Sequence, residues 1–214
     1  MEKLVSTLLV WLCTAPCWGF QVNVTVQDKS QAPLANVVVQ LIPQTPFTPP
    51  KPSQIAVMDQ VKSQFKPHIL VVQKDSLIDF PNSDSIKHHV YSFSSAKTFE
   101  LKLYKGFSAQ PLAFEKAGVV ELGCNVHDWM LGYIYVADTP YFAKTDANGS
   151  VLIEVPAGEY QLTLWNPRIQ DPADSLLQTV QINANLRITH QLNQGLLPSH
   201  LDHESDVDEF SDYD

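Results

Sequence analysis

Residues 119–136 read VVELGCNVHDWMLGYIYV, which is two apolar runs joined by a short polar loop. Both runs are rich in β-branched and aromatic residues, a composition that favours β-strands. Cys124 ends the first predicted strand, His127 lies on the loop, and Met130 opens the second strand. We therefore expect these three side chains to converge on one point where the two strands meet.

The donor atoms of these side chains suit a copper ion. A blue-copper electron-transfer site takes two histidines and one cysteine in a plane, with a methionine bound weakly along the axis. The loop supplies only one histidine, so the second must come from another segment, and His88 and His89 are the candidates. Neighbouring strand residues face opposite sides of a sheet, so only one of them can point at Cys124. Both faces carry apolar side chains here, and alternation does not choose between the two.

The N-terminus has the features of a secretory signal peptide over residues 1–19. Lys3 precedes an apolar run at residues 4–13, and small residues stand at the predicted cleavage site. Cleavage would remove Cys13 and Cys17 and leave Cys124 as the one cysteine of an exported chain. No later segment is apolar for long enough to cross a bilayer. We therefore expect a periplasmic protein without a membrane span, whose thiol is ligated rather than an inert buried group.

The other end of the chain, residues 195–214, is an acidic tail that we expect to be disordered and solvated. The formal net charge of the sequence is −9, and much of it lies in this tail. The acidic residues there are Asp202, Glu204, Asp206, Asp208, Glu209, Asp212 and Asp214. Because no strongly basic segment exists, binding to nucleic acid is not expected.

The body between these ends is predicted to be all-β. Short strand-like runs rich in Val, Ile, Leu, Phe and Tyr are separated by turn residues, and no window has a clear helical period. Such spacing predicts sandwiches or barrels. Residues 43–52 contain five prolines and read as an extended linker. A second boundary is predicted at residues 138–140, before a turn at Asn148 and Gly149.

The motif Cys-x2-His-x2-Met at Cys124, His127 and Met130, with an upstream His-x-Val, resembles the cupredoxins. Its short spacing to Met130 most resembles that of amicyanin, whereas plastocyanin-type loops are longer. Residues 88–136 resemble the cupredoxins of methylamine utilisation. The resemblance implies a Greek-key sandwich over residues 52–138 with one mononuclear type 1 copper. Cupredoxins usually have His-Asn-Val at the upstream position, with the first residue as ligand. The resemblance therefore favours His88 as the ligand over His89, which stays the alternate ligand.

The segments on either side resemble a carboxypeptidase-regulatory-like β-sandwich. The likeness lies in residues 31–39 and 145–160, where alternating apolar residues flank turns. It implies a split second sandwich made of residues 20–45 and 139–194, with the cupredoxin inserted between its strands. Such modules have binding or spacing roles, which implies no chemistry for these segments.

The resemblance to cupredoxins implies a periplasmic protein that carries single electrons between redox partners and has no enzymatic activity. The partner would be a protein such as a c-type cytochrome or a dehydrogenase. One alternative is a copper carrier or storage protein, and another is a non-catalytic glycan- or protein-binding module with a structural cupredoxin. A zinc site would need more cysteines, and a Cys–His nucleophile would need an orienting group and a substrate cleft.

Overall fold

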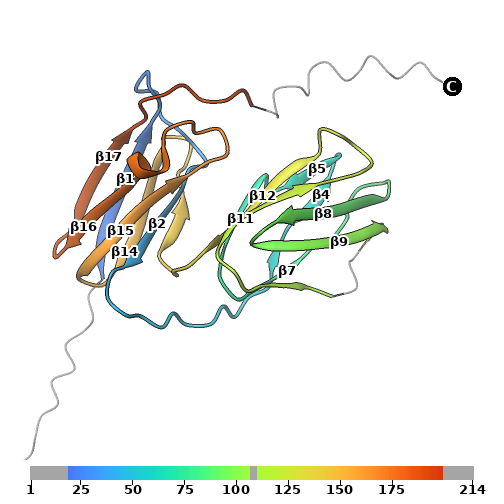
Figure 1. Cartoon of the computed structure of the whole chain (residues 1–214), viewed down its shortest axis with the longest axis horizontal. Coiled ribbons are helices and arrows are strands. Elements are labelled where there is room, and N and C mark those ends of the chain that lie inside the picture. Colours follow the sequence, from blue (N-terminus) through green and yellow to red (C-terminus); the bar gives the residue numbers. More distant parts are fainter. Residues whose placement is uncertain (1–18, 107–109, 200–214) are drawn as a thin grey trace, which may run out of the picture.

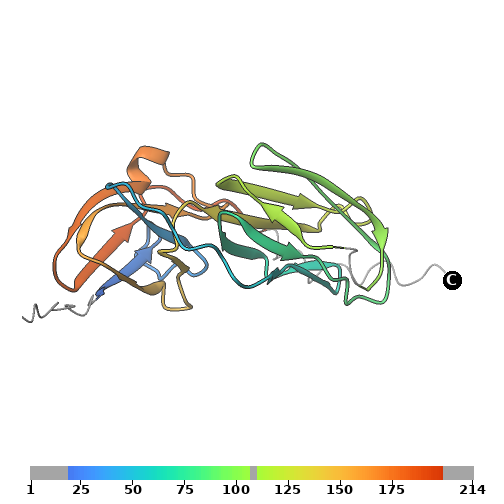
Figure 2. The same cartoon turned by 90° about the horizontal axis from the view of Figure 1, so that it is seen from below.

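The computed structural model describes residues 19–106 and 110–199, which form two β-sandwich lobes that follow one another along the long axis (Figures 1 and 2). The predicted all-β fold is confirmed. The predicted signal peptide, except Gly19, and residues 200–214 of the predicted tail lie outside the described residues. Within the described ranges, no helix is long and apolar enough to cross a membrane.

The first lobe is built from both ends of the described chain. Its elements are β1 (Phe20–Gln27), β2 (Val38–Pro43), β13 (Phe142–Lys144), β14 (Ser150–Val155), β15 (Gly158–Trp165), the 3-10 helix η1 (Ala173–Leu176), β16 (Leu177–Ile182) and β17 (Leu186–Gln191). They form a three-stranded sheet in the order β14-β1-β17 and a four-stranded sheet in the order β13-β2-β15-β16. Alternate residues of β1, namely Val22, Val24 and Val26, are fully buried in the core between the two sheets. This period of two is the pattern of a strand with one face against a core.

The second lobe contains all the strands that lie between β2 and β13 in the chain. They are β3 (Ala56–Val57), β4 (Asp59–Val61), β5 (Gln64–Lys66), β6 (Ile69–Gln73), β7 (Ser76–Asp79), β8 (His88–Ser94), β9 (Lys97–Tyr104), β10 (Leu112–Phe114), β11 (Gly118–Gly123) and β12 (Leu131–Ala137). The largest sheet has the order β6-β12-β11-β8-β9, and a smaller one has the order β10-β7-β3. Phe65, Phe80 and Phe114 fill the core of this lobe. The predicted domain bounds, residues 52–138 for one domain and residues 20–45 with 139–194 for the other, stay predictions.

The lobes are joined by a packed interface as well as by the proline-rich segment that links β2 to β3 (Figure 1). Trp165 of the first lobe lies 5.7 Å from Tyr133 and 5.3 Å from Tyr135 of the second, measured between ring centroids. The Gln40 side-chain amide donates to the Tyr135 hydroxyl at 2.9 Å. These contacts bury Tyr133 together with Val38 of the first lobe.

Asp171 is a buried residue of the first lobe, and its carboxylate binds the segment that follows β17. It accepts the backbone N–H of Asn193 at 2.7 Å, the Asn193 side-chain amide at 3.1 Å and the backbone N–H of Gln194 at 2.9 Å. Burial alone would raise the pKa of Asp171, but these hydrogen bonds outweigh it and lower the pKa below 3.8. The carboxylate therefore stabilises the fold wherever it is ionised.

Replacing Asp171 by alanine should lower the free energy of unfolding by about 2–3 kcal/mol at neutral pH, because three hydrogen bonds to a buried carboxylate are lost. A depressed folded-state pKa gives stability that is present above the ordinary pKa of 3.8 and is lost as the pH falls through the folded-state value. Urea unfolding at neutral pH and below pH 3.8 measures both effects. Asp174→Ala, at an exposed site, is the control, and an equal loss in this control would contradict the assignment.

Candidate metal centre

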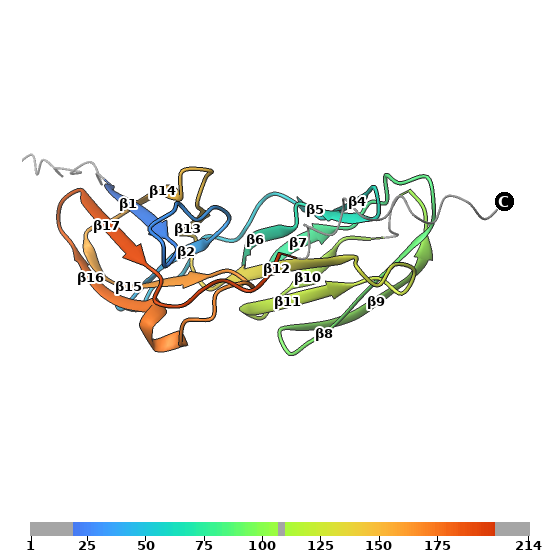
Figure 3. The same ribbon diagram turned by 90° about the horizontal axis from the view of Figure 1, so that it is seen from above.

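Three metal-ligating side chains meet at the end of the second lobe that points away from the first lobe. The loop between β11 and β12 lies there, beside the start of β8 (Figures 1 and 3). One ligand atom each from His88, Cys124 and His127 can be chosen so that all three lie within 4.8 Å of one another. The Nδ1 atom of His88 is 3.8 Å from the Sγ atom of Cys124. The structure thus brings together three of the four side chains predicted as ligands.

The local backbone explains why Cys124 and His127 face the same point. Cys124 follows directly after β11, and β12 begins at Leu131, so the loop spans only a few residues. The backbone N–H of Met130 donates to the His127 carbonyl at 3.0 Å and closes the loop as a turn. The backbone N–H of Val126 donates to Cys124 Sγ at 3.4 Å. The sulfur is thus held by a backbone donor at the end of β11.

A glycine before the cysteine allows a ring of β8 to pack closely over β11. A Cβ atom on Gly123 would lie 2.6 Å from the Tyr91 ring, closer than such atoms approach in proteins. Gly123 also pairs with Tyr91 in the sheet. A larger residue at position 123 would therefore force the Tyr91 ring away from β11.

The two adjacent histidines of β8 have different surroundings. His88 is fully buried, and its Nε2 atom lies 2.9 Å from the Asp84 carboxylate. His89 is also buried, but its Nε2 atom pairs with Glu100 at 2.8 Å. The metal-ligating group of the described residues includes His88 and leaves out His89.

Asp84 fixes the orientation of the His88 ring and was not singled out in the sequence. Its carboxylate accepts the backbone N–H of Ser63 at 2.7 Å as well as the His88 contact. Burial would raise the pKa of Asp84, but the Ser63 and His88 contacts lower it overall. Because an ionised carboxylate only accepts, His88 Nε2 donates to it, and Nδ1 is the ring nitrogen on the side of Cys124. In the sequence, the one sign of this role was that Asp84 stands four residues before His88.

His127 has a nitrogen that needs a partner. Its Nδ1 atom is buried and has no hydrogen-bond partner among the described residues, while Nε2 lies 3.4 Å from the Ser63 hydroxyl. Burial lowers the pKa of His127, and the neighbouring His88 lowers it further against an opposing effect of Asp84. The ring is therefore held in the neutral form that binds metals. An unpaired buried nitrogen is costly, and a bound metal would satisfy it.

Met130, the predicted axial ligand, is buried at 2% exposure and packs in the same apolar cluster as Cys124. Thiolate, thioether and two imidazoles form the donor set of a type 1 copper site. Carboxylates do not enter the metal-ligating group of the described residues, which disfavours hard ions such as Mg²⁺ or Ca²⁺. The residues present therefore fit copper.

No protein-family model matches the sequence, and no curated protein matches it significantly. Among solved structures, it is similar to a purple cupredoxin from Nitrosopumilus maritimus, at 20% identity and a TM-score of 0.35 over 38% of this chain and 99% of that one. It is also similar to an amicyanin variant in its reduced Cu(I) form, at 20% identity and a TM-score of 0.36 over 46% and 98%.

A copper-containing nitrite reductase from Thermus scotoductus is similar at 18% identity and a TM-score of 0.38, over 44% of this chain and 25% of that one. Each of these three likenesses covers less than half of the present chain. The methylamine-utilisation type and the carboxypeptidase-regulatory-like flanks stay predictions.

Proposed function

We propose that the chain is a blue-copper protein that binds one copper ion through His88, Cys124 and His127, with Met130 as the weak axial ligand. The observation that carries the proposal is the buried group of two imidazoles and one thiol, in which His127 Nδ1 has no other described partner. Copper bound by such a donor set supplies a one-electron redox couple.

The surrounding residues would keep the site rigid. Asp84 orients His88, the Val126 N–H contacts Cys124, and the core of the second lobe encloses Met130. A site whose ligands are held by packing and hydrogen bonds changes little between oxidation states. Such rigidity is an advantage for an electron carrier and is not needed in a copper store.

The surface beside His127 is where we place the approach of a redox partner. His127 is partly exposed, and its ring lies 4.9 Å from that of Trp129, which is 53% exposed. Val126 next to it is 44% exposed. The partner would be a c-type cytochrome or a dehydrogenase, and the location would be the periplasm.

Replacing Met130 by leucine should keep the blue colour and raise the reduction potential. Loss of the thioether removes a donor that stabilises Cu(II), while the two imidazoles and the thiolate remain. A tenfold change in the relative binding of the two oxidation states corresponds to about 59 mV for one electron. We expect a rise of about that size in voltammetry of the copper-loaded protein. A loss of colour would show that Met130 is needed to form the site.

Voltammetry of the copper-loaded wild-type chain tests electron transfer itself. A carrier should give a reversible one-electron wave, because its ligands stay in place through the cycle. A copper store, or a glycan- or protein-binding module with a structural cupredoxin, has no need of rapid cycling. Copper binding without a reversible wave would therefore count against the carrier function and in favour of storage.

A further inference from the structure

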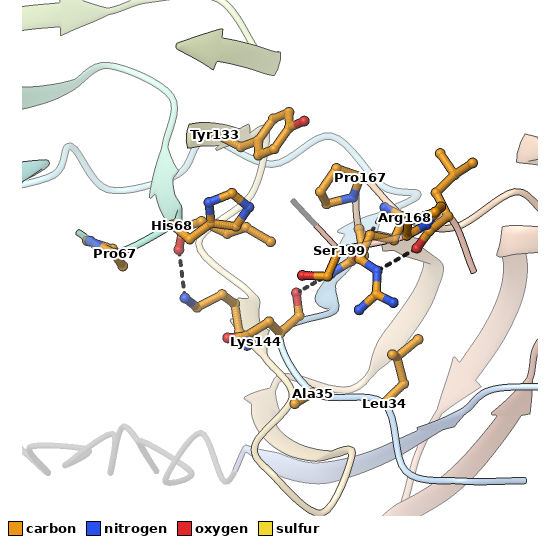
Figure 4. A pocket seen from close by; sticks show the side chains of 14 residues that line it. Leu34, Ala35, Pro67, His68, Tyr133, Lys144, Pro167, Arg168 and Ser199 are labelled. Carbon is orange, nitrogen blue, oxygen red and sulfur yellow. Dashed lines mark hydrogen bonds between the residues drawn. The ribbon is translucent and has the colours of Figure 1, made fainter. Parts of the chain in front are cut away.

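A pocket of about 250 Å³ lies between the two lobes and is lined by residues of both (Figure 4). His68 and Tyr133 come from the second lobe, and Lys144, Asn166 and Arg168 come from the first. Its volume is below the range of pockets for drug-sized molecules and suits a small ligand.

The charged side chains around this pocket are cationic. Lys144 and Arg168 line it, and none of its described lining residues is an aspartate or a glutamate. Neither cation forms an ion pair with another described residue. Buried or half-buried charges are normally paired, so two unpaired cations in one pocket are unusual. They are more so in a chain whose formal net charge is −9, where carboxylates outnumber cations.

Lys144 and Arg168 are each held by a hydrogen bond from the side chain and keep further N–H donors. The Lys144 ammonium donates to the Ile69 carbonyl at 2.6 Å, across the lobe interface. The Arg168 side chain donates through Nε to the Leu197 carbonyl at 2.7 Å, and its backbone N–H is fixed by the Asn166 side chain at 3.0 Å. An ammonium has three N–H donors and a guanidinium has five, so most of these donors are left for a ligand.

Burial without a counter-charge lowers the pKa of Lys144 from 10.5. An anion in the pocket would offset this cost and would contact groups from both lobes. We propose that this pocket binds a small oxyanion, carried by a phosphate or a carboxylate compound, through Lys144 and Arg168. The ligand would thereby strengthen the contact between the lobes.

The full-length protein should be titrated with inorganic phosphate and, separately, with citrate, at constant ionic strength kept with chloride. Calorimetry should show one saturable site per chain, and the thermal unfolding midpoint should rise with probe concentration. Tighter binding of phosphate would place the ligand among phosphates, and tighter binding of citrate among carboxylates. Saturable binding of neither probe would overturn the proposal.

Matched substitutions locate the binding. Arg168→Gln and Lys144→Gln should each lower the affinity for the more tightly bound probe by about tenfold, because each removes a charge-assisted hydrogen bond. Arg187→Gln and Lys29→Gln, at exposed positions, should change it by less than about twofold. If Lys144→Gln fails to fold, Arg168→Gln alone decides. Equal weakening in the control variants would show general surface electrostatics and overturn the proposal.

The acidic residues that follow Ser199 are a rival occupant, since Ser199 itself lines the pocket. A variant with Asp202→Asn, Glu204→Gln and Asp206→Asn separates the two. A small-molecule site should bind the probe with the same affinity, within about twofold, in this variant and in the wild type. Probe binding that is present only in the variant would show that the tail takes the pocket, which would overturn the proposal.

Discussion

The copper-loaded Cys124→Ser variant is expected to lose the intense visible absorption of the wild type completely. That absorption arises from charge transfer between a thiolate and Cu(II), and Cys124 is the one cysteine of the described residues. A serine hydroxyl is a harder donor that does not replace it. The measurement is the visible spectrum during titration with Cu(II).

Asn125→Ser is the control for this experiment, since Asn125 is the exposed neighbour of Cys124 and should leave the spectrum unchanged. An unchanged absorption band in Cys124→Ser would place the copper elsewhere. A wild-type protein that stays colourless with copper and binds zinc as readily would remove the basis for electron transfer.

The His88→Gly variant should bind copper more weakly by more than about 100-fold, and added imidazole should restore the colour. The lower bound follows from the tenfold to 100-fold cost of removing a group that merely supports a metal ligand. The ring of His88 is fully buried, so its removal leaves a space next to Cys124 that free imidazole can fill. Visible titration with and without imidazole measures both effects.

His89→Asn is the matched control, because His89 pairs with Glu100 and lies outside the metal-ligating group. It should keep the colour and the copper affinity nearly unchanged. The opposite pattern, in which His89→Asn loses colour and His88→Gly keeps it, would show that His89 is the ligand.

Local patterns in the sequence were enough to predict the loop that holds the site. The runs on either side of Cys124 and Met130 have strand composition, and β11 and β12 are found there with each end shifted by one residue. Strand ends shift because hydrogen bonding to neighbouring strands, rather than composition, sets where pairing stops. Cys124 thus follows β11 rather than ending it.

The orientation of the histidine pair could not be predicted from alternation. The register between β8 and β9 shifts between His88 and Val90, and such an irregularity changes which side chain faces inward. His88 and His89 are both buried, so exposure does not separate them either. Only the tertiary contacts to Asp84 and Cys124 distinguish them.

The pocket between the lobes could not be predicted from the sequence, because tertiary packing brings its lining residues together. Lys144 lies in β13, whereas His68 precedes β6 and Arg168 follows β15, so the three residues are far apart in the chain. Each looks like an ordinary surface residue when considered alone. Their common surroundings arise from the way the second lobe packs against β2 and β15, which no local pattern records.

Electron paramagnetic resonance of the full-length protein with one equivalent of Cu(II) tests the copper site most directly. Sharing of the unpaired electron with the Cys124 sulfur should give a single species with narrow hyperfine splitting and one copper per chain. The broad splitting of a tetragonal site with only nitrogen and oxygen ligands, unchanged in Cys124→Ser, would contradict copper binding by His88, Cys124 and His127.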